Sequence, residues 1–161
     1  MSESREAALR LADFLPYQLS IASNAVSNRI AEIYRQRFGL KIPEWRIMAV
    51  LGDRGALTQR MLTEATLMDK VAVNRACKTL EARGLLGRAP NAQDGRSHHL
   101  ALTDAGRAMH GEIMPLARDM EHRLFGSLEE ADRAAFRRLL AAVLDTAESH
   151  DPAAGFPATG S

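Results

Sequence analysis

Residues 69–106 read DKVAVNRACKTLEARGLLGRAPNAQDGRSHHLALTDAG, and the change of pattern within this stretch decides the fold. In its first part, apolar residues recur at three- and four-residue steps on one helical face, while polar and basic residues occupy the other face. Asp69 suits the N-cap of a helix over about residues 70–83, and Gly84 suits its end. We therefore expect a helix with one buried face and one basic, exposed face.

After this helix the pattern changes to that of short strands. Two strands are expected at residues 85–89 and 98–102, and turn-forming residues fill the gap between them, as in a β-hairpin. Thr103 suits the N-cap of a further helix that runs to about Leu124. That helix is expected to bend where Pro115 removes a backbone donor. The stretch thus combines a helix, a hairpin and a second helix.

Three more helices are expected before this stretch. The first covers residues 15–37, and Gly39 is placed to form its left-handed cap. The second begins at Pro43 and is expected to break within residues 52–55, which contain two glycines. A short third helix opens at residues 57–58, and Thr58 suits its N-cap. Within residues 43–102 the order of elements is then three helices followed by a hairpin.

The chain is therefore predicted to be mainly α, with a winged helix-turn-helix at about residues 43–102. Long helices on either side, at about residues 15–37 and 103–148, carry apolar faces that so small a module cannot cover. Helices of this kind pack against a second copy of the chain, so we expect a homodimer. Residues 1–14 are expected to form an N-terminal arm, and residues 149–161 a disordered tail.

Composition and charge narrow the class of protein. The 161 residues are 46% hydrophobic and 25% charged, which is typical of a soluble globular protein. The sequence has no apolar run long enough for a membrane span and no signal peptide, so the cytoplasm is the expected location. The net charge is only +1, yet residues 54–96 hold eight Lys or Arg and four Asp or Glu. A basic middle of this kind indicates a module that binds a polyanion.

Five segments occur in the order and at the spacing of a winged helix. They are Ile42-Pro43-Glu44-Trp45-Arg46, Met68-Asp69-Lys70-Val71-Ala72-Val73-Asn74-Arg75, Leu80-Glu81-Ala82-Arg83-Gly84-Leu85-Leu86, Asp94-Gly95-Arg96 and Leu102-Thr103-Asp104-Ala105-Gly106. On these residues the sequence resembles the MarR family of bacterial transcription regulators over about residues 15–146. One departure is in the wing, where the family often has Asp-x-Arg-Asp-x-Arg. Residues 91–96 read NAQDGR, so only the second half of that pattern is present.

The resemblance implies a MarR-type domain over residues 15–148 and a ligand-responsive homodimeric repressor that binds double-stranded DNA at a pseudo-palindromic operator. Neither catalysis nor an obligate cofactor is expected. The helix at 70–83 would enter the major groove, where Arg and Lys donate to guanine and Asn pairs with adenine. At the wing tip, Asp94 would hold Arg96 extended toward the minor groove. The residues expected to contact DNA are Lys70, Asn74, Arg75, Lys78, Arg88, Asp94 and Arg96.

Effectors of the resembled family commonly lodge between the dimerising helices and the winged module. The residues expected to line that junction are Ser27, Tyr34, Trp45, Arg46 and His110. Tyr34 and Trp45 offer aromatic faces, and Arg46 is suited to a carboxylate. Trp45 is at least as well explained as the core anchor of its helix. An aromatic acid or its thioester is the effector class that the resemblance implies.

Other chemistries find less support. Cys77 is the only cysteine, and its expected place on the inner helical face favours packing over peroxide sensing. His98 and His99 are adjacent on a strand and point to opposite faces, so no metal site is expected. The sequence has no phosphate loop or nucleophile elbow, so no enzyme is expected. Two alternatives stay open: a redox-sensing regulator acting through Cys77, and a dimeric small-molecule-binding module without operator binding.

Overall fold

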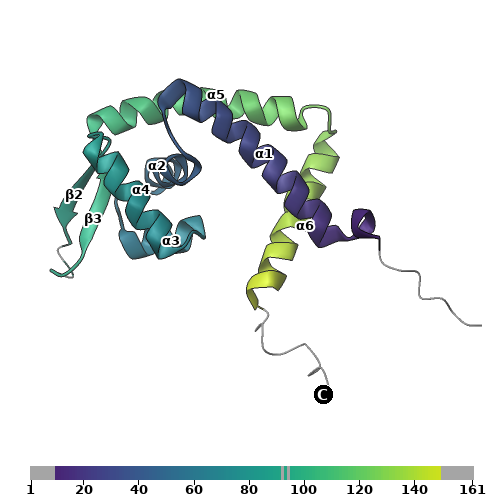
Figure 1. Cartoon of the computed structure of the whole chain (residues 1–161), viewed down its shortest axis with the longest axis horizontal. Coiled ribbons are helices and arrows are strands. Elements are labelled where there is room, and N and C mark those ends of the chain that lie inside the picture. Colours follow the sequence, from purple (N-terminus) through teal and green to yellow (C-terminus); the bar gives the residue numbers. More distant parts are fainter. Residues whose placement is uncertain (1–9, 92, 94, 150–161) are drawn as a thin grey trace, which may run out of the picture. The chain divides into compact units, whose positions relative to one another are not determined.

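The computed structural model describes residues 10–91, 93 and 95–149 (Figure 1). In chain order the elements are η1 (Leu11–Asp13), α1 (Leu15–Phe38), α2 (Ile42–Arg54), β1 (Leu57–Thr58), α3 (Gln59–Thr66), α4 (Lys70–Ala82), β2 (Leu86–Pro90), β3 (His98–Leu102), α5 (Asp104–Phe125) and α6 (Glu130–Ser149). This confirms a mainly α winged helix-turn-helix. The chain divides into two compact units, one up to Pro115 and one from Leu116 onward. The predicted arm and tail lie largely outside the described residues.

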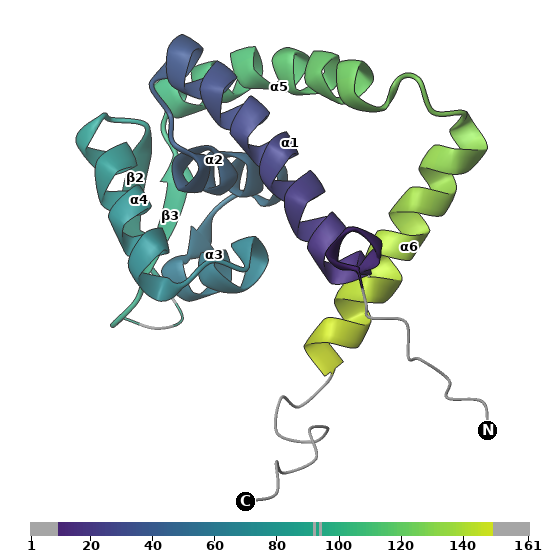
Figure 2. The same cartoon turned by 45° about the vertical axis from the view of Figure 1, so that its right-hand side comes forward.

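α2 is the central helix of the first unit, where it contacts α1, α3, α4 and β3 (Figures 1 and 2). Its inner face is formed by Ile47, Met48 and Leu51, all of which are buried. At its first turn, the Glu44 carboxylate accepts a hydrogen bond from the Lys41 backbone N–H at 2.9 Å, which satisfies one donor left free at a helix start. α2 is therefore the platform on which the other elements of this unit pack.

α2 continues past residue 52, where the sequence predicted a break to begin. It ends at Arg54, and the N–H of Gly55, which has a positive φ, donates to the Leu51 carbonyl at 3.0 Å. Gly52 is helical, and its small size serves a contact: a Cβ built there would lie 2.2 Å from Nε2 of His110 on α5. The helix end predicted within residues 52–55 is confirmed, but Gly55 is the residue that ends the helix, whereas Gly52 makes room for a neighbour.

The strands form one antiparallel sheet in the order β1-β3-β2. The β2–β3 hairpin is confirmed, with β2 one residue later than expected at Leu86–Pro90. β1 was not predicted: Leu57 pairs with Leu100, so this segment is a strand before it turns into α3. The expected cap is nevertheless present, because the Thr58 hydroxyl accepts a hydrogen bond from the Met61 N–H at 3.3 Å.

The start of α5 is hydrogen-bonded to the residues that follow α4. The Thr103 N–H donates to the Leu85 carbonyl at 3.1 Å, and the Thr103 hydroxyl donates to the Gly84 carbonyl at 2.6 Å. The same hydroxyl accepts from the Gly106 N–H at 3.1 Å, which confirms Thr103 as the N-cap. A Cβ at Gly106 would lie 2.1 Å from the Leu85 carbonyl oxygen, so only glycine fits there.

The second unit contains the end of α5 and all of α6. The Phe125 and Phe136 rings lie 5.9 Å apart, and Glu121 and Arg137 form an ion pair at 3.4 Å. Nevertheless α6 has no buried residue, although it carries a stripe of apolar side chains. The exposed members of this stripe are Phe136, Leu139, Leu140, Val143 and Leu144.

Candidate nucleic-acid interface and effector pocket

α4 has two faces of opposite character. Val73, Cys77 and Leu80 are completely buried, as the sequence predicted. Arg75 and Lys78 lie on the opposite side of the helix and are exposed. Because residues four apart lie one turn further along the same face, the exposed residues form a stripe along α4. Such a stripe is the surface that a helix presents to a groove.

The first turn of α4 is well formed. The Asp69 carboxylate accepts a hydrogen bond from the Ala72 N–H at 2.8 Å, which confirms the predicted N-cap. Lys70 follows the cap and is exposed, and Asn74 is half-buried one turn further on. The polar side chains expected to contact DNA on α4 therefore lie within its first three turns.

The wing is the loop between β2 and β3. The Asn91 N–H donates to the Ser97 carbonyl, and the Asn91 amide donates to the Ser97 hydroxyl, both at 3.0 Å. The Gln93 N–H donates to the Asn91 side-chain oxygen at 3.1 Å. Arg96 is exposed near the tip, while Asp94, which was expected to orient it, lies outside the described residues. The hydrogen bonds at residue 91 close the base of the wing.

Arg88 on β2 has a role that the sequence did not indicate. Its guanidinium donates to the carboxylate of Glu81 on α4, and the two side chains are 37% and 24% exposed. This ion pair joins β2, the strand that leads into the wing, to α4. The contact of Arg88 with a DNA phosphate stays a prediction. The ion pair with Glu81 is by itself a structural reason for an arginine at this position.

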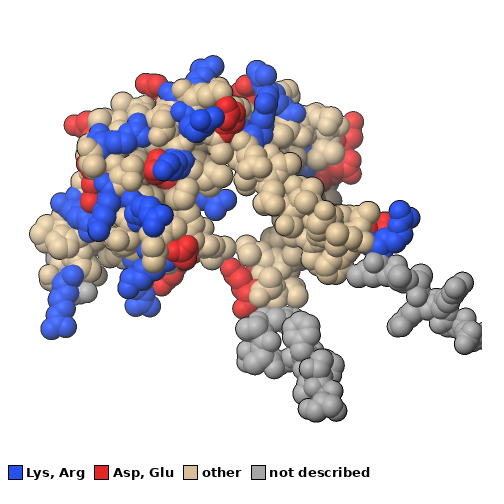
Figure 3. Space-filling model, viewed as in Figure 1, with Lys and Arg blue, Asp and Glu red and all other residues tan. Residues whose placement is uncertain are grey.

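Basic side chains gather over α4 and the wing (Figure 3). The exposed basic residues among those expected to contact DNA are Lys70, Arg75, Lys78 and Arg96. Within the described part of the chain, Lys70, Arg75 and Lys78 form no salt bridge with an acidic side chain. By contrast, Arg35 on α1 is paired with Glu32 at 2.7 Å. The α4 cations are thus available to an external anion.

Cys77 has the environment of a core residue. Its side chain is completely buried, and burial, aided by the negative charge of Glu81, raises the pKa of the thiol to about 11, while Arg88 acts in the opposite direction. A thiol with so high a pKa carries almost no thiolate near neutral pH, and the thiolate is the reactive form. The structure therefore supports packing as the role of Cys77.

Two of the residues expected to bind an effector pack against each other. The Tyr34 and Trp45 rings lie 5.3 Å apart at 68°, and burial raises the pKa of Tyr34. Trp45 therefore anchors α2 to α1. Its indole Nε1–H is buried and has no acceptor among the described residues, whereas Ser27 and Arg46 are half-buried. A buried donor without an acceptor is costly, which makes Trp45 a candidate contact for a ligand.

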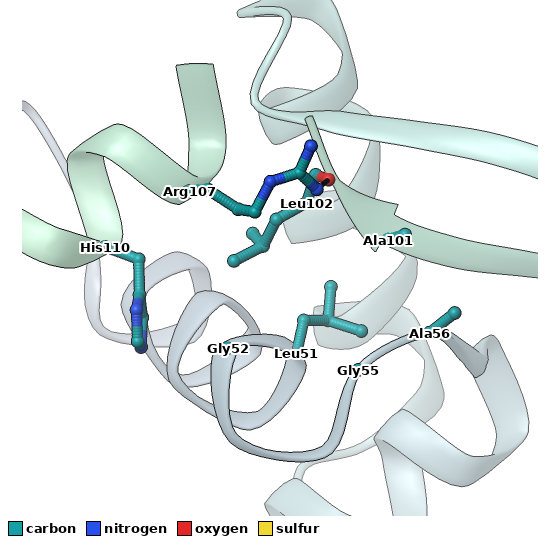
Figure 4. Close-up of a pocket in the computed structure, with 8 residues that line it drawn as sticks. All are labelled: Leu51, Gly52, Gly55, Ala56, Ala101, Leu102, Arg107 and His110. Carbon is teal, nitrogen blue, oxygen red and sulfur yellow. Dashed lines mark hydrogen bonds between the residues drawn. The ribbon is translucent and has the colours of Figure 1, made fainter. Parts of the chain in front are cut away.

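The remaining member of that set, His110, lines a separate pocket of about 450 Å³ in the first unit (Figure 4). The pocket is lined by Leu51, Gly52, Gly55, Ala56, Ala101, Leu102, Arg107 and His110. His110 projects from α5 toward Gly52 of α2, whereas Arg107 extends from α5 toward Leu102 at the end of β3. One guanidinium nitrogen of Arg107 donates to the Leu102 carbonyl at 2.7 Å, and another donates to Asp104. Two basic side chains thus lie beside small and apolar residues.

Arg107 was missed by sequence reasoning, although a signal existed. It lies in the first turn of α5, where the helix dipole favours acidic side chains over basic ones. The packing role of Gly52 was also missed, because a glycine that makes room for a neighbour has the same sequence signal as one that ends a helix. Among residues 10–91, 93 and 95–149, no three His, Cys, Asp or Glu side chains are grouped as a metal site would require. Within the same residues, no helix is long and apolar enough to cross a membrane.

Comparison with known proteins identifies the family. A sequence model described as the MarR family matches residues 38–97. The transcriptional repressor NicR of Pseudomonas putida is 30% identical over 102 residues, which is 63% of this chain and 65% of NicR, so the match spans just under two thirds of that relative's length.

Solved structures match over almost their whole length. The MarR family regulator SPO1453 of Silicibacter pomeroyi is 31% identical, with a TM-score of 0.74 over 86% of this chain and 98% of that one. BpsR of Bordetella bronchiseptica, whose DNA binding is regulated by 6-hydroxynicotinic acid, is 28% identical, with a TM-score of 0.67 over 78% and 98%. With the winged helix-turn-helix described above, these matches show that the chain belongs to the MarR family of transcriptional regulators.

Proposed function

We propose that this protein is a homodimeric repressor that binds a pseudo-palindromic DNA operator and is released by a small aromatic acid. The observation that carries the DNA-binding part is the exposed stripe of α4, in which Arg75 and Lys78 lie opposite a fully buried face. An α-helix fits the major groove of B-DNA, and Arg donates two hydrogen bonds to guanine there. The wing, with Arg96 near its tip, is joined to α4 through Arg88 and Glu81 and contacts the adjacent minor groove.

A dimer with two-fold symmetry would recognise an operator with matching symmetry. Two symmetry-related α4 helices read two half-sites that mirror each other, so a pseudo-palindromic sequence is expected. The exposed apolar stripe of α6 supports dimerisation, since an apolar face of this kind is stable in water only when it is covered.

The effector binds in the pocket beside Arg107 and His110. A carboxylate fits the guanidinium and imidazole, and the small residues around Gly52 leave space for a ring. BpsR, whose DNA binding is regulated by 6-hydroxynicotinic acid, supports an aromatic acid as the effector class. The buried indole N–H of Trp45 favours a second possible position for the same ligand, at the α1–α2 contact.

The DNA-binding part is tested with two single substitutions and a control. Arg75→Ala is expected to lower the affinity for operator far more than for random DNA, because a bidentate base contact carries about 1–3 kcal/mol of discrimination. Arg96→Ala is expected to weaken both and to reduce the salt dependence of binding, because each lost phosphate or groove contact lowers the log–log slope by about one unit. Affinities for both DNAs at several salt concentrations provide the measurement.

Arg35→Ala is the matched control, because it removes the same charge from an exposed position on α1, outside α4 and the wing. It should leave both affinities and the salt slope close to those of the wild type. If Arg75→Ala lowered both affinities equally, α4 would contact only the DNA backbone. If the wild type showed no salt-dependent DNA binding, the alternative of a small-molecule-binding module without an operator would hold.

A further inference from the structure

An aliphatic side chain is exposed within the basic surface of α4. Val71 is 65% exposed, whereas the other branched apolar residues of this helix, Val73 and Leu80, are completely buried. Nothing in the packing of the first unit needs Val71, because the core face of α4 is on the other side. An exposed valine at this place is therefore a candidate for contact with a partner rather than for folding.

The position of Val71 on the helix identifies that partner. With 3.6 residues per turn, residues 71, 75 and 78 share one face, so Val71 continues the stripe of Arg75 and Lys78 toward the N-terminus. The neighbouring Lys70 is also exposed. A partner that covers Val71 must then accept several cations within two turns of the helix. This charge favours a nucleic acid over an apolar protein surface.

Only one group on the major-groove edges of DNA is apolar. The C5-methyl of thymine distinguishes thymine from cytosine and is recognised through contacts with apolar side chains. On this basis, and resting on the DNA binding proposed above, we infer that Val71 contacts the C5-methyl of a thymine in each half-site. Val71 is then a specificity-determining residue beside Arg75, with a different recognition chemistry: Arg75 donates hydrogen bonds to a base, and Val71 excludes water from a methyl group.

The test removes the methyl group from the DNA and the side chain from the protein, separately and together. The probe is a duplex of about 30 base pairs, long enough for two half-sites, selected from random DNA by the full-length wild-type protein. Each thymine is replaced by uracil, symmetrically in both half-sites, and the affinity is measured. When the contacted thymine is replaced by uracil in both half-sites, the affinity of the wild-type protein is expected to fall about fourfold for each half-site. This is the effect of losing the burial of one methyl group.

In Val71→Ala, the same uracil substitution is expected to have little further effect, because the methyl group has already lost its contact. Val71→Thr retains the size and one methyl group of valine and is expected to retain part of the discrimination. Leu67→Ala is the matched control, since Leu67 is 66% exposed but precedes α4; it should keep the full sensitivity to uracil. Circular dichroism of each variant establishes that it is folded.

The outcomes separate this inference from the proposed function. If Val71→Ala retained the wild-type penalty at every thymine, or if Leu67→Ala lost it instead, the assignment to Val71 would be wrong while DNA binding stood. If the wild-type protein selected no sequence from random DNA, the proposed operator binding itself would fail.

Discussion

At the scale of the single residue, burial decides the chemistry of Cys77. Burial in the folded protein raises the pKa of the Cys77 thiol from its ordinary value of 9.0 to about 11. Because the folded state binds the proton more tightly than the unfolded chain, this group contributes stability below about pH 9 and loses it as the pH rises toward 11. We expect wild-type stability to fall through this range by up to about 2 kcal/mol more than that of Cys77→Ala. Urea unfolding at several pH values measures the difference.

The same burial bears on the redox alternative. Peroxide at neutral pH is expected to leave DNA binding unchanged in the wild type, and Cys77→Ser should behave in the same way apart from a modest loss of stability from burying a hydroxyl. Peroxide-dependent release of DNA that disappears in Cys77→Ser would establish Cys77 as a sensor and contradict this interpretation.

At the scale of the element, the first turns of α5 connect the pocket beside Arg107 and His110 to the winged module. Thr103 and Gly106 fix this end of the helix against the Gly84 and Leu85 carbonyls, while His110 lies over Gly52 of α2. A ligand between α5 and α2 therefore acts on the junction through which the helix meets the sheet and α4. If the proposed effector binds in this pocket, this junction is the route by which it would change the orientation of α4 and the wing.

We expect Arg107→Gln and His110→Ala to weaken binding of an aromatic acid such as 6-hydroxynicotinic acid at least tenfold, because loss of one charge-assisted hydrogen bond costs about 1.5–3 kcal/mol. DNA affinity without ligand should change much less for His110→Ala than for Arg75→Ala. Calorimetric titration measures the first quantity, and a DNA-binding assay the second. Trp45→Phe removes the indole N–H together with part of the ring system, and it serves as the comparison. A larger loss for Trp45→Phe than for either α5 variant would place the ligand at the α1–α2 contact.

At the scale of the whole molecule, α6 carries an apolar stripe that one chain leaves uncovered. Leu139 is 54% exposed and Val143 is 52% exposed, while no residue of α6 is buried. We expect light scattering at micromolar concentration to give a mass near twice the 17.7 kDa of the chain. Deletion of residues 149–161 should leave the dimer intact, and deletion from residue 128 onward should abolish it.

A finer test uses neighbouring positions on α6. Leu139→Glu places a charge within the stripe and should shift the mass toward that of a monomer, because burying an unpaired carboxylate is strongly unfavourable. Arg138→Glu changes charge at the adjacent exposed position and should remain dimeric. A stable monomer of the unaltered chain at these concentrations would contradict the proposed dimer.

The sequence by itself determined the elements whose signals are local. The faces of α4, the caps at Thr58, Asp69 and Thr103, and the left-handed end of α1 at Gly39 were all predicted and are confirmed. Each depends on residues within one or two turns of each other, so the period and the capping residue are sufficient. The exposed cations of α4 were placed correctly for the same reason, since a buried face fixes the opposite one.

The tertiary structure alone decided the contacts between residues distant in the chain. The pairing of Leu57 with Leu100, the ion pair of Arg88 with Glu81 and the fit of His110 over Gly52 all join separate elements. A two-residue strand has no period of its own, and a glycine has the same sequence signal whether it ends a helix or admits a neighbour. The buried indole of Trp45 and the exposure of Val71 likewise depend on which surfaces meet. Local periodicity specifies a helix and its face, but packing determines what that face contacts.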